Sequence, residues 1–161
     1  MTWFVGAISA QSPYNWQKAK DVSLFGITTH GRKTNSSFIK EGDKLLIWLG
    51  QSGWIACNQI TGPARPPISR EEVPWGGGLH RFGLVFPFQI DFETNAPVWV
   101  PFKDGRQEKT GMAIFSIRKG FSQLPDEVGK NIYELMKNNL DGIKKPSPSE
   151  IRNLKLKNAA K

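Results

Sequence analysis

The sequence predicts one small α+β domain whose sheet is mostly antiparallel and strongly curved, so that it forms a partial β-barrel flanked by short helices. A chain of 161 residues with a 39% apolar fraction is long enough for one domain with a proper core and too short for two. The predicted elements follow one another as strand, short helix, hairpin, long loop, long strand, short strand and helix. This order places several strands in succession and separates them from the last helix, as is typical of an α+β fold.

The first part of the chain is expected to contain a strand, a short helix and a hairpin. Residues 3–8 form a β-rich run, and Pro13 opens the helix, because a first helical turn does not need the N–H that proline lacks. A polar, basic segment follows at 30–37 (HGRKTNSS), which we expect to be a mobile loop. Residues 43–49 and 54–60 are typical of two strands around the turn GQSG.

The second part is expected to contain a long loop, a long strand and an amphipathic helix. The loop spans 61–78 and holds four prolines. In the strand over 80–92, apolar residues recur at every second position, while Pro87 indicates an edge or a bulge. Residues 96–102 resemble another short strand or extended segment. Residues 123–140 carry their apolar residues on one helical stripe, and Pro125-Asp126-Glu127 supplies a helix start with acidic residues in the first turn.

Most of the positive charge lies near the C-terminus. The net charge is +8, and residues 143–161 hold six basic side chains and one acidic one. We therefore divide the chain into a folded domain, 1–142, and a basic tail or linker, 143–161. Lysine and arginine displace the counterions of phosphates, so this charge fits a nucleic-acid partner, but a solvated tail explains it equally well.

The sequence lacks the residue patterns that catalysis would need. His30 and His80 have no metal-binding spacing, and no nucleophile elbow, Walker loop or carboxylate–lysine nuclease motif is present. The single cysteine, Cys57, excludes an internal disulfide and a cysteine-based zinc site, and its place in a strand is typical of a buried apolar residue. We therefore expect no enzymatic activity, no metal and no cofactor.

The expected location is the cytoplasm, without a membrane partner. No run approaches the roughly twenty apolar residues that cross a bilayer. The N-terminus has only a short apolar stretch and no basic region before it, unlike a signal peptide.

Several motifs, in their order along the chain, resemble the EVE domains of the PUA-like superfamily. The N-terminal motifs are Trp3-Phe4-Val5, Asn15-Trp16, Leu24-Phe25-Gly26-Ile27 and Lys40-Glu41-Gly42-Asp43 before an apolar strand. The later ones are Gly53-Trp54-Ile55-Ala56-Cys57, the proline-rich loop with Trp75, and Arg81-Phe82. The resemblance covers roughly residues 2–136, and the order of the motifs carries it.

The resemblance implies a PUA-like fold related to the YTH readers of methylated adenine. Proteins of this superfamily extrude a base and hold it in an aromatic cage. In prokaryotes, EVE-like domains are often the specificity part of modification-dependent restriction systems, coupled to a nuclease or NTPase. The implied function is recognition of a modified base, flipped from DNA, without a change to that base. Where YTH relatives have a cage tryptophan near the apolar-Gly turn, this chain has Leu24-Phe25.

Such a pocket needs aromatic walls, hydrogen-bonding groups and a cationic rim. Flipping costs a few kcal/mol, and stacking on aromatic rings returns roughly 1–3 kcal/mol per base. We expect the walls to be Phe25, Trp54 and Trp75. The polar groups expected to read the base edge are Ser9, Asn15, Ser23 and Asn58. The expected phosphate contacts are Arg32, Lys33, Arg65, Arg70, Arg81, Arg118 and Lys119.

Other interpretations of these residues and of the whole chain remain open. Core packing explains Trp54 and Phe25 equally well, and helix caps or turn hydrogen bonds explain Ser9, Asn15 and Ser23 just as well. One alternative function is an RNA-binding reader of the same fold, which competition between modified single-stranded RNA and duplex DNA would separate from a DNA reader. Another is a small-molecule or protein-interaction module, whose binding would depend little on salt, whereas phosphate binding weakens steeply as salt rises.

Overall fold

The computed structural model describes residues 1–29, 38–147 and 149, so the segment 30–37, expected to be a mobile loop, lies outside the described residues. The elements in chain order are β1 (Trp3–Ile8), α1 (Asn15–Val22), β2 (Leu24–Thr28), β3 (Lys44–Leu49), β4 (Gly53–Ile60), the 3-10 helix η1 (Arg70–Glu72), α2 (Gly78–Arg81), β5 (Phe82–Val98), β6 (Phe102–Lys103), β7 (Arg106–Gln107), α3 (Ile114–Arg118), β8 (Phe121–Leu124) and α4 (Asp126–Asn138).

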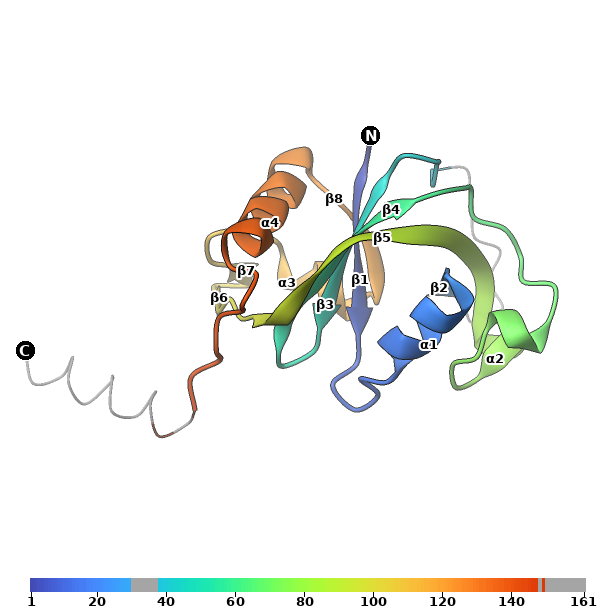
Figure 1. The fold of residues 1–161 in the computed structure, drawn as a ribbon, viewed down its shortest axis with the longest axis horizontal. Helices are drawn as coiled ribbons and strands as arrows, with labels where there is room; N and C mark the ends of the chain where they lie inside the picture. Colours follow the sequence, from blue (N-terminus) through green and yellow to red (C-terminus); the bar gives the residue numbers. More distant parts are fainter. Residues whose placement is uncertain (30–37, 148, 150–161) are drawn as a thin grey trace, which may run out of the picture.

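One curved sheet of six strands organises the molecule, in the order β2-β5-β4-β3-β1-β8 (Figure 1). All neighbouring strands are antiparallel except β1 and β3, which are parallel. Strands β6 and β7 form a separate ribbon. The α+β class and the mostly antiparallel, strongly curved sheet predicted from the sequence are therefore confirmed.

The curvature is carried by β5, which is 17 residues long and arches across the molecule in Figure 1. Its first part pairs with β2 as far as Pro87, opposite Leu24. Its pairing with β4 begins at the next residue, Phe88, opposite Ile60. Proline has no N–H for a sheet hydrogen bond, so Pro87 is tolerated inside a central strand at the point where the partner strand changes.

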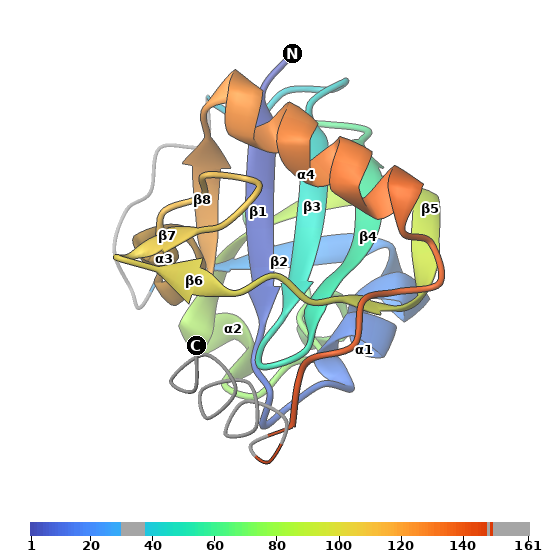
Figure 2. The ribbon, with the colours of Figure 1, turned by 90° about the vertical axis from the view of Figure 1, so that its left-hand side faces the viewer.

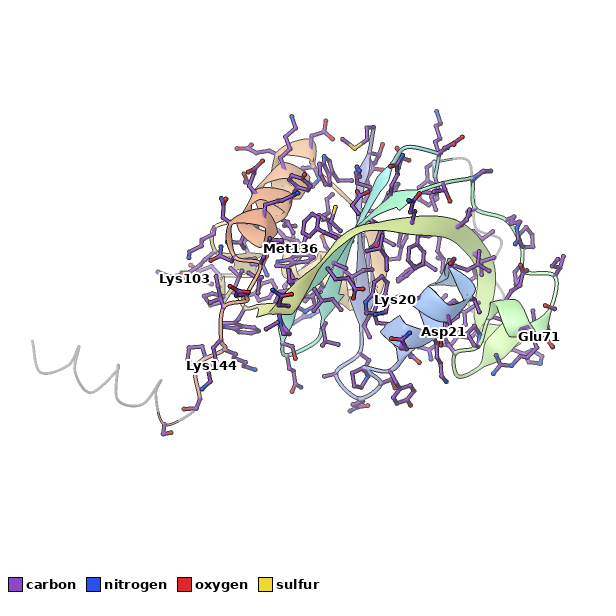
Figure 3. All side chains as sticks on the ribbon, viewed as in Figure 1. Lys20, Asp21, Glu71, Lys103, Met136 and Lys144 are labelled. Carbon is purple, nitrogen blue, oxygen red and sulfur yellow. The ribbon has the colours of Figure 1, made fainter. Side chains whose placement is uncertain are left out.

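The alternation of side chains along the strands creates two cores, one on each face of the sheet. In β1, Phe4 belongs to the core that α1 covers, and Val5 belongs to the core that α4 covers. Figure 2 shows α4 lying across β1, β3 and β4. In Figure 3, Met136 lies on the side of α4 that faces the sheet, and it is fully buried. Two-sided burial explains why β3 and β4 are apolar at consecutive positions.

Several predicted elements agree with the structure and others differ. The strand over 3–8, the helix after Pro13 and the hairpin of β3 and β4 are confirmed. The short strand expected over 96–102 was wrong in part, because residues up to Val98 continue β5. The last helix begins at Asp126, which confirms the helix start expected at Pro125-Asp126-Glu127, whereas residues 123 and 124 of the expected stripe belong to β8, which pairs with β1.

The C-terminal part of the described chain returns to the end of β5. The Trp99 N–H donates to the Ile143 carbonyl oxygen at 3.0 Å, and the Lys145 ammonium lies 4.8 Å from the centre of the Trp99 ring. Figure 3 shows Lys144 at the opposite end of the molecule from Glu71 of η1. In the part of the chain that the structure describes, no helix has the length and apolar character needed to span a membrane.

Candidate functional site

A cavity of about 300 Å³ lies between the end of β1, the strand β2, the helix α1 and the turn from α3 to β8. Its size is at the lower end of the range of small-molecule pockets. Its lining consists of Ala7, Ile8, Ser9, Asn15, Ala19, Phe25, Gly26, Thr28, Trp75, Arg81, Phe82, Arg118, Lys119, Gly120 and Phe121. Residues from six separate segments of the chain therefore meet at one place.

Aromatic rings form the walls of this cavity. The centres of the Trp75 and Phe82 rings are 5.0 Å apart, and the Phe25 ring lies 6.1 Å from Phe121. Trp75 and Phe25 are only 4% and 5% exposed, so a small part of each ring lines the cavity while the rest is packed in the core. Such rings lose little conformational freedom when a flat ligand stacks on them, because packing already fixes their rotamers.

Two glycines set the positions of these rings. A Cβ atom on Gly26 would lie 2.7 Å from Cζ3 of Trp75 and 2.8 Å from Cδ1 of Phe82. A Cβ atom on Gly6 of β1 would lie 2.5 Å from Cζ of Phe25. All three distances are too short for real contacts, so any side chain at either glycine would displace a ring that lines the cavity.

Polar groups of three kinds face the same space. The Trp75 indole N–H donates to the Asn15 carbonyl oxygen at 3.1 Å, which fixes the orientation of the indole. The Asn15 side-chain amide has no hydrogen-bond partner among the described residues, and it offers both a donor and an acceptor. The Ser9 hydroxyl oxygen accepts from the Gln11 N–H at 3.2 Å and keeps its own proton to donate. Thr28 adds a second hydroxyl. This set can complement the mixed donors and acceptors of a base edge.

The rim of the cavity is cationic. Arg81, Arg118 and Lys119 are exposed, and none of them forms an ion pair with another described residue. The Arg81 guanidinium lies 5.5 Å from the centre of the Phe82 ring. None of the described residues that line the cavity is acidic. The rim therefore attracts an anion such as a phosphate group.

The structure does not bring Trp54 to the cavity. Trp54 is fully buried in the core under α4, where it lies edge-on to Trp48 with ring centres 5.1 Å apart. Its indole N–H donates to Oε1 of Gln107 at 3.0 Å. The ring and its polar edge are both occupied by the core, which corrects its expected place as a stacking wall.

Two of the expected polar residues also lie elsewhere. Asn58 is fully buried, and its amide donates to the Leu45 carbonyl oxygen at 3.1 Å across the β3–β4 pair. Ser23 ends α1 in the left-handed conformation with φ of 54°, and its N–H donates to the Lys20 carbonyl oxygen at 3.2 Å. Neither side chain lines the cavity.

The cations of the proline-rich loop have structural partners. Arg65 donates two hydrogen bonds to the Glu72 carboxylate, at 2.9 and 2.6 Å. Together with the Ile68 N–H, these bonds hold the pKa of Glu72 down at about 2. Arg70 donates to the Val73 carbonyl oxygen and does not line the cavity. The other two cations expected on phosphate, Arg32 and Lys33, lie outside the described residues.

Among the lining residues that were not predicted from the sequence, Thr28, Phe82 and Phe121 carry a hydroxyl group or an aromatic ring. Phe82 was named only as part of a motif, although it follows the expected cation Arg81 directly. Thr28 and Phe121 had no signal of their own, because β8 is too short to show an alternating pattern and Thr28 stands at the end of a strand. Phe121 and Thr28 reach the cavity because β8 pairs with β1 and β2 pairs with β5, and these pairings are not visible in the sequence.

The described residues were also expected to lack a metal site and a reactive thiol. No group of three or more histidine, cysteine, aspartate or glutamate residues gathers there as metal ligands. Burial, and then the charge of Asp91, raise the pKa of the Cys57 thiol to about 12, so this thiol stays protonated at neutral pH.

Comparison with known proteins defines the class of fold. No family model matches the chain, and no curated protein matches it. The solved YTH domain of Toxoplasma CPSF4 without ligand has a TM-score of 0.56 at 14% identity, over 91% of this chain and 90% of that one. Its complex with a 7-mer m6A-modified RNA has a TM-score of 0.55 at 14% identity, over 89% and 95%. A hypothetical protein from Leishmania major has a TM-score of 0.51 at 13% identity, over 86% and 96%. The chain therefore has a PUA-like fold of the YTH type.

Proposed function

We propose that this protein is a non-enzymatic reader that captures one modified base of a nucleic acid in the cavity beside α1. The observation that carries the proposal is the combination found there: aromatic walls, an Asn15 amide without a partner among the described residues, and a rim with three cations and no acid. A nucleic acid, which has flat bases, polar base edges and charged phosphates, fits this combination better than a neutral small molecule does.

The physical roles follow from the geometry. The rings of Phe25, Trp75 and Phe82 offer stacking surfaces worth roughly 1–3 kcal/mol per base, which offsets the few kcal/mol lost when a base leaves its stack. A methyl group buried against these rings adds about 0.8 kcal/mol. Asn15 and Ser9 would distinguish one base edge from another by hydrogen bonds, and Arg118 and Lys119 would hold the flanking phosphates.

The comparisons support the proposal through the fold. The Toxoplasma YTH domain is solved with an m6A-modified RNA, and this chain has the same type of fold. The finer parts of the proposal rest on the sequence: membership of the EVE domains, DNA as the nucleic acid, and a nuclease or NTPase as the partner in a restriction system. RNA is the second nucleic acid to test.

The direct test is a titration with matched oligonucleotides. Unmodified, N6-methyladenine, 5-methylcytosine and 5-hydroxymethylcytosine forms of one sequence would be compared, as duplex DNA and as single-stranded DNA and RNA, at two salt concentrations. The change in tryptophan fluorescence gives the Kd. We expect at least a tenfold preference for one modification, which is about 1.4 kcal/mol, and weaker binding at high salt.

A variant pair connects this preference to the cavity. Asn15→Ala removes the side-chain amide but keeps the carbonyl oxygen that accepts from Trp75, and alanine favours the helix that starts there. The matched control is Asn95→Ala, an exposed asparagine outside the cavity. We expect Asn15→Ala to lose discrimination while Asn95→Ala keeps it. Equal binding of all four forms by the unaltered protein would reject the reader function, and salt-independent binding would favour the small-molecule alternative.

A further inference from the structure

A second hollow lies directly beside the cavity and shares Phe121 and Lys119 with it. Its volume is about 450 Å³, and its surface includes Phe38 and Phe115. These two phenylalanines are 39% and 65% exposed, although most of the aromatic residues in the described part of the chain are buried. Exposed aromatic rings beside a proposed base pocket are surfaces on which another base can stack.

The second hollow is held in a fixed position relative to the cavity. The Ala7 N–H of β1 donates to the Gly120 carbonyl oxygen at 2.8 Å, which ties the turn after α3 to the strand that ends at the cavity. The Ser122 hydroxyl donates to the Ser116 carbonyl oxygen at 3.0 Å, which ties α3 to β8. The exposed ring of Phe115 therefore stands on a short helix that is bonded to β8 at its middle and to β1 through the turn that follows it.

Cationic side chains stand where the two hollows meet. Lys119 lines both of them, and Arg118 lines the cavity while its guanidinium lies 5.6 Å from the centre of the Phe115 ring. Neither hollow has an acidic side chain among the described residues that line it. A phosphate that links two nucleotides would be attracted to this position, with one base on either side of it.

We propose that the second hollow binds the nucleotide adjacent to the captured base, with its base stacked on Phe115, so that the ligand is single-stranded over at least these two nucleotides. This inference rests on the proposed function and adds the strand state of the ligand and a subsite for its neighbour. A single strand is required because the neighbouring base can reach Phe115 only after it has left its own stack. The cations between the hollows favour a nucleotide over an apolar protein segment.

The test uses 7-mer single strands that carry the base modification preferred by the unaltered protein among N6-methyladenine, 5-methylcytosine and 5-hydroxymethylcytosine. Three forms are compared: the intact strand, a strand abasic on the 5′ side of the modified base, and a strand abasic on its 3′ side. The proteins are the unaltered chain, Phe115→Ala, Phe115→Trp and the control Leu140→Ala, which changes another exposed apolar residue outside both hollows.

We expect one of the two abasic strands to bind the unaltered protein about 5- to 150-fold more weakly than the intact strand. Phe115→Ala should lose a similar factor on the intact strand and become insensitive to that abasic site. Phe115→Trp should retain the affinity of the unaltered protein, because it keeps an aromatic surface. Leu140→Ala should behave as the unaltered protein does. Circular dichroism and a thermal melt check that each variant is folded.

Three results would overturn the inference. One is an unchanged Kd for Phe115→Ala. Another is an abasic site that weakens binding to Phe115→Ala as much as it weakens binding to the unaltered protein, because the neighbouring base and the Phe115 ring would then not interact. The third is tighter binding of duplex than of single strands. In each case the preference for a modified base can persist, so the proposed function stands. Loss of that preference in the unaltered protein would reject both.

Discussion

Replacing Trp54 by phenylalanine tests whether this tryptophan belongs to the core or to the site. The indole N–H of Trp54 donates to Oε1 of Gln107, which also accepts from the Thr110 hydroxyl at 2.6 Å. Phenylalanine lacks that N–H. The loss of this hydrogen bond costs about 1 kcal/mol, because Oε1 of Gln107 still accepts from the Thr110 hydroxyl. Phenylalanine also removes two ring carbons from a fully buried site, which costs about 0.8 kcal/mol each.

The expected loss is therefore about 2–3 kcal/mol of unfolding free energy, or a melting temperature lower by roughly 4–12 °C for a chain of this size. A thermal melt followed by circular dichroism measures it. Titration with the preferred modified oligonucleotide, well below the melting temperature, should give an unchanged Kd. The matched variant Trp75→Phe should weaken binding, because it removes part of a cavity wall and the hydrogen bond to Asn15. A normal melt with weakened binding for Trp54→Phe would refute its assignment to the core.

Further predictions concern the cavity wall, the rim and the proline-rich loop. Gly26→Ala displaces two aromatic rings of the cavity wall, so we expect a stability loss of about 1–3 kcal/mol by denaturant titration and weaker binding of the modified base. Arg118→Gln should make the slope of log Kd against log salt shallower by about one, whereas Arg65→Gln should leave it unchanged, because that guanidinium is held by Glu72. The lowered pKa of Glu72 contributes stability above its ordinary value of 4.5, and this stability is lost as pH falls toward about 2. Arg65→Gln should therefore flatten the fall of the melting temperature in that pH window, and an equally steep fall would contradict this explanation.

Local patterns in the sequence predict those elements that depend on neighbouring residues. The strand over 3–8, α1 and the β3–β4 hairpin were predicted from apolar runs, Pro13 and the GQSG turn. The strand β8 and the helix α3 were not predicted. Four and five residues are too short for a periodic pattern, and β8 exists through its pairing with β1, more than a hundred residues earlier in the chain.

The candidate site was predicted in part, for a reason that lies in the sheet. Phe25, Trp75, Ser9 and Asn15 meet at the cavity, whereas Asn58 of β4 does not. Strand β4 is covered on both faces, so almost all of its residues are apolar or buried and the period of two disappears. Without that period of two, the sequence does not indicate which face of the sheet a β4 side chain such as Asn58 occupies. The position of Asn58 relative to the site therefore cannot be derived from the sequence.

The contrast between the two tryptophans shows what decides whether such a residue can serve a ligand. Both stand close to glycines in the sequence, and both are almost fully buried. The N–H of Trp54 is bonded to a side chain 53 residues away inside the second core, so every edge of this ring is enclosed. The N–H of Trp75 is bonded to a backbone oxygen of α1, 60 residues away. This bond holds the ring in place, and part of the ring lines the cavity. The partner of the indole N–H, more than the burial of the ring, therefore separates a core tryptophan from a cavity wall in this fold.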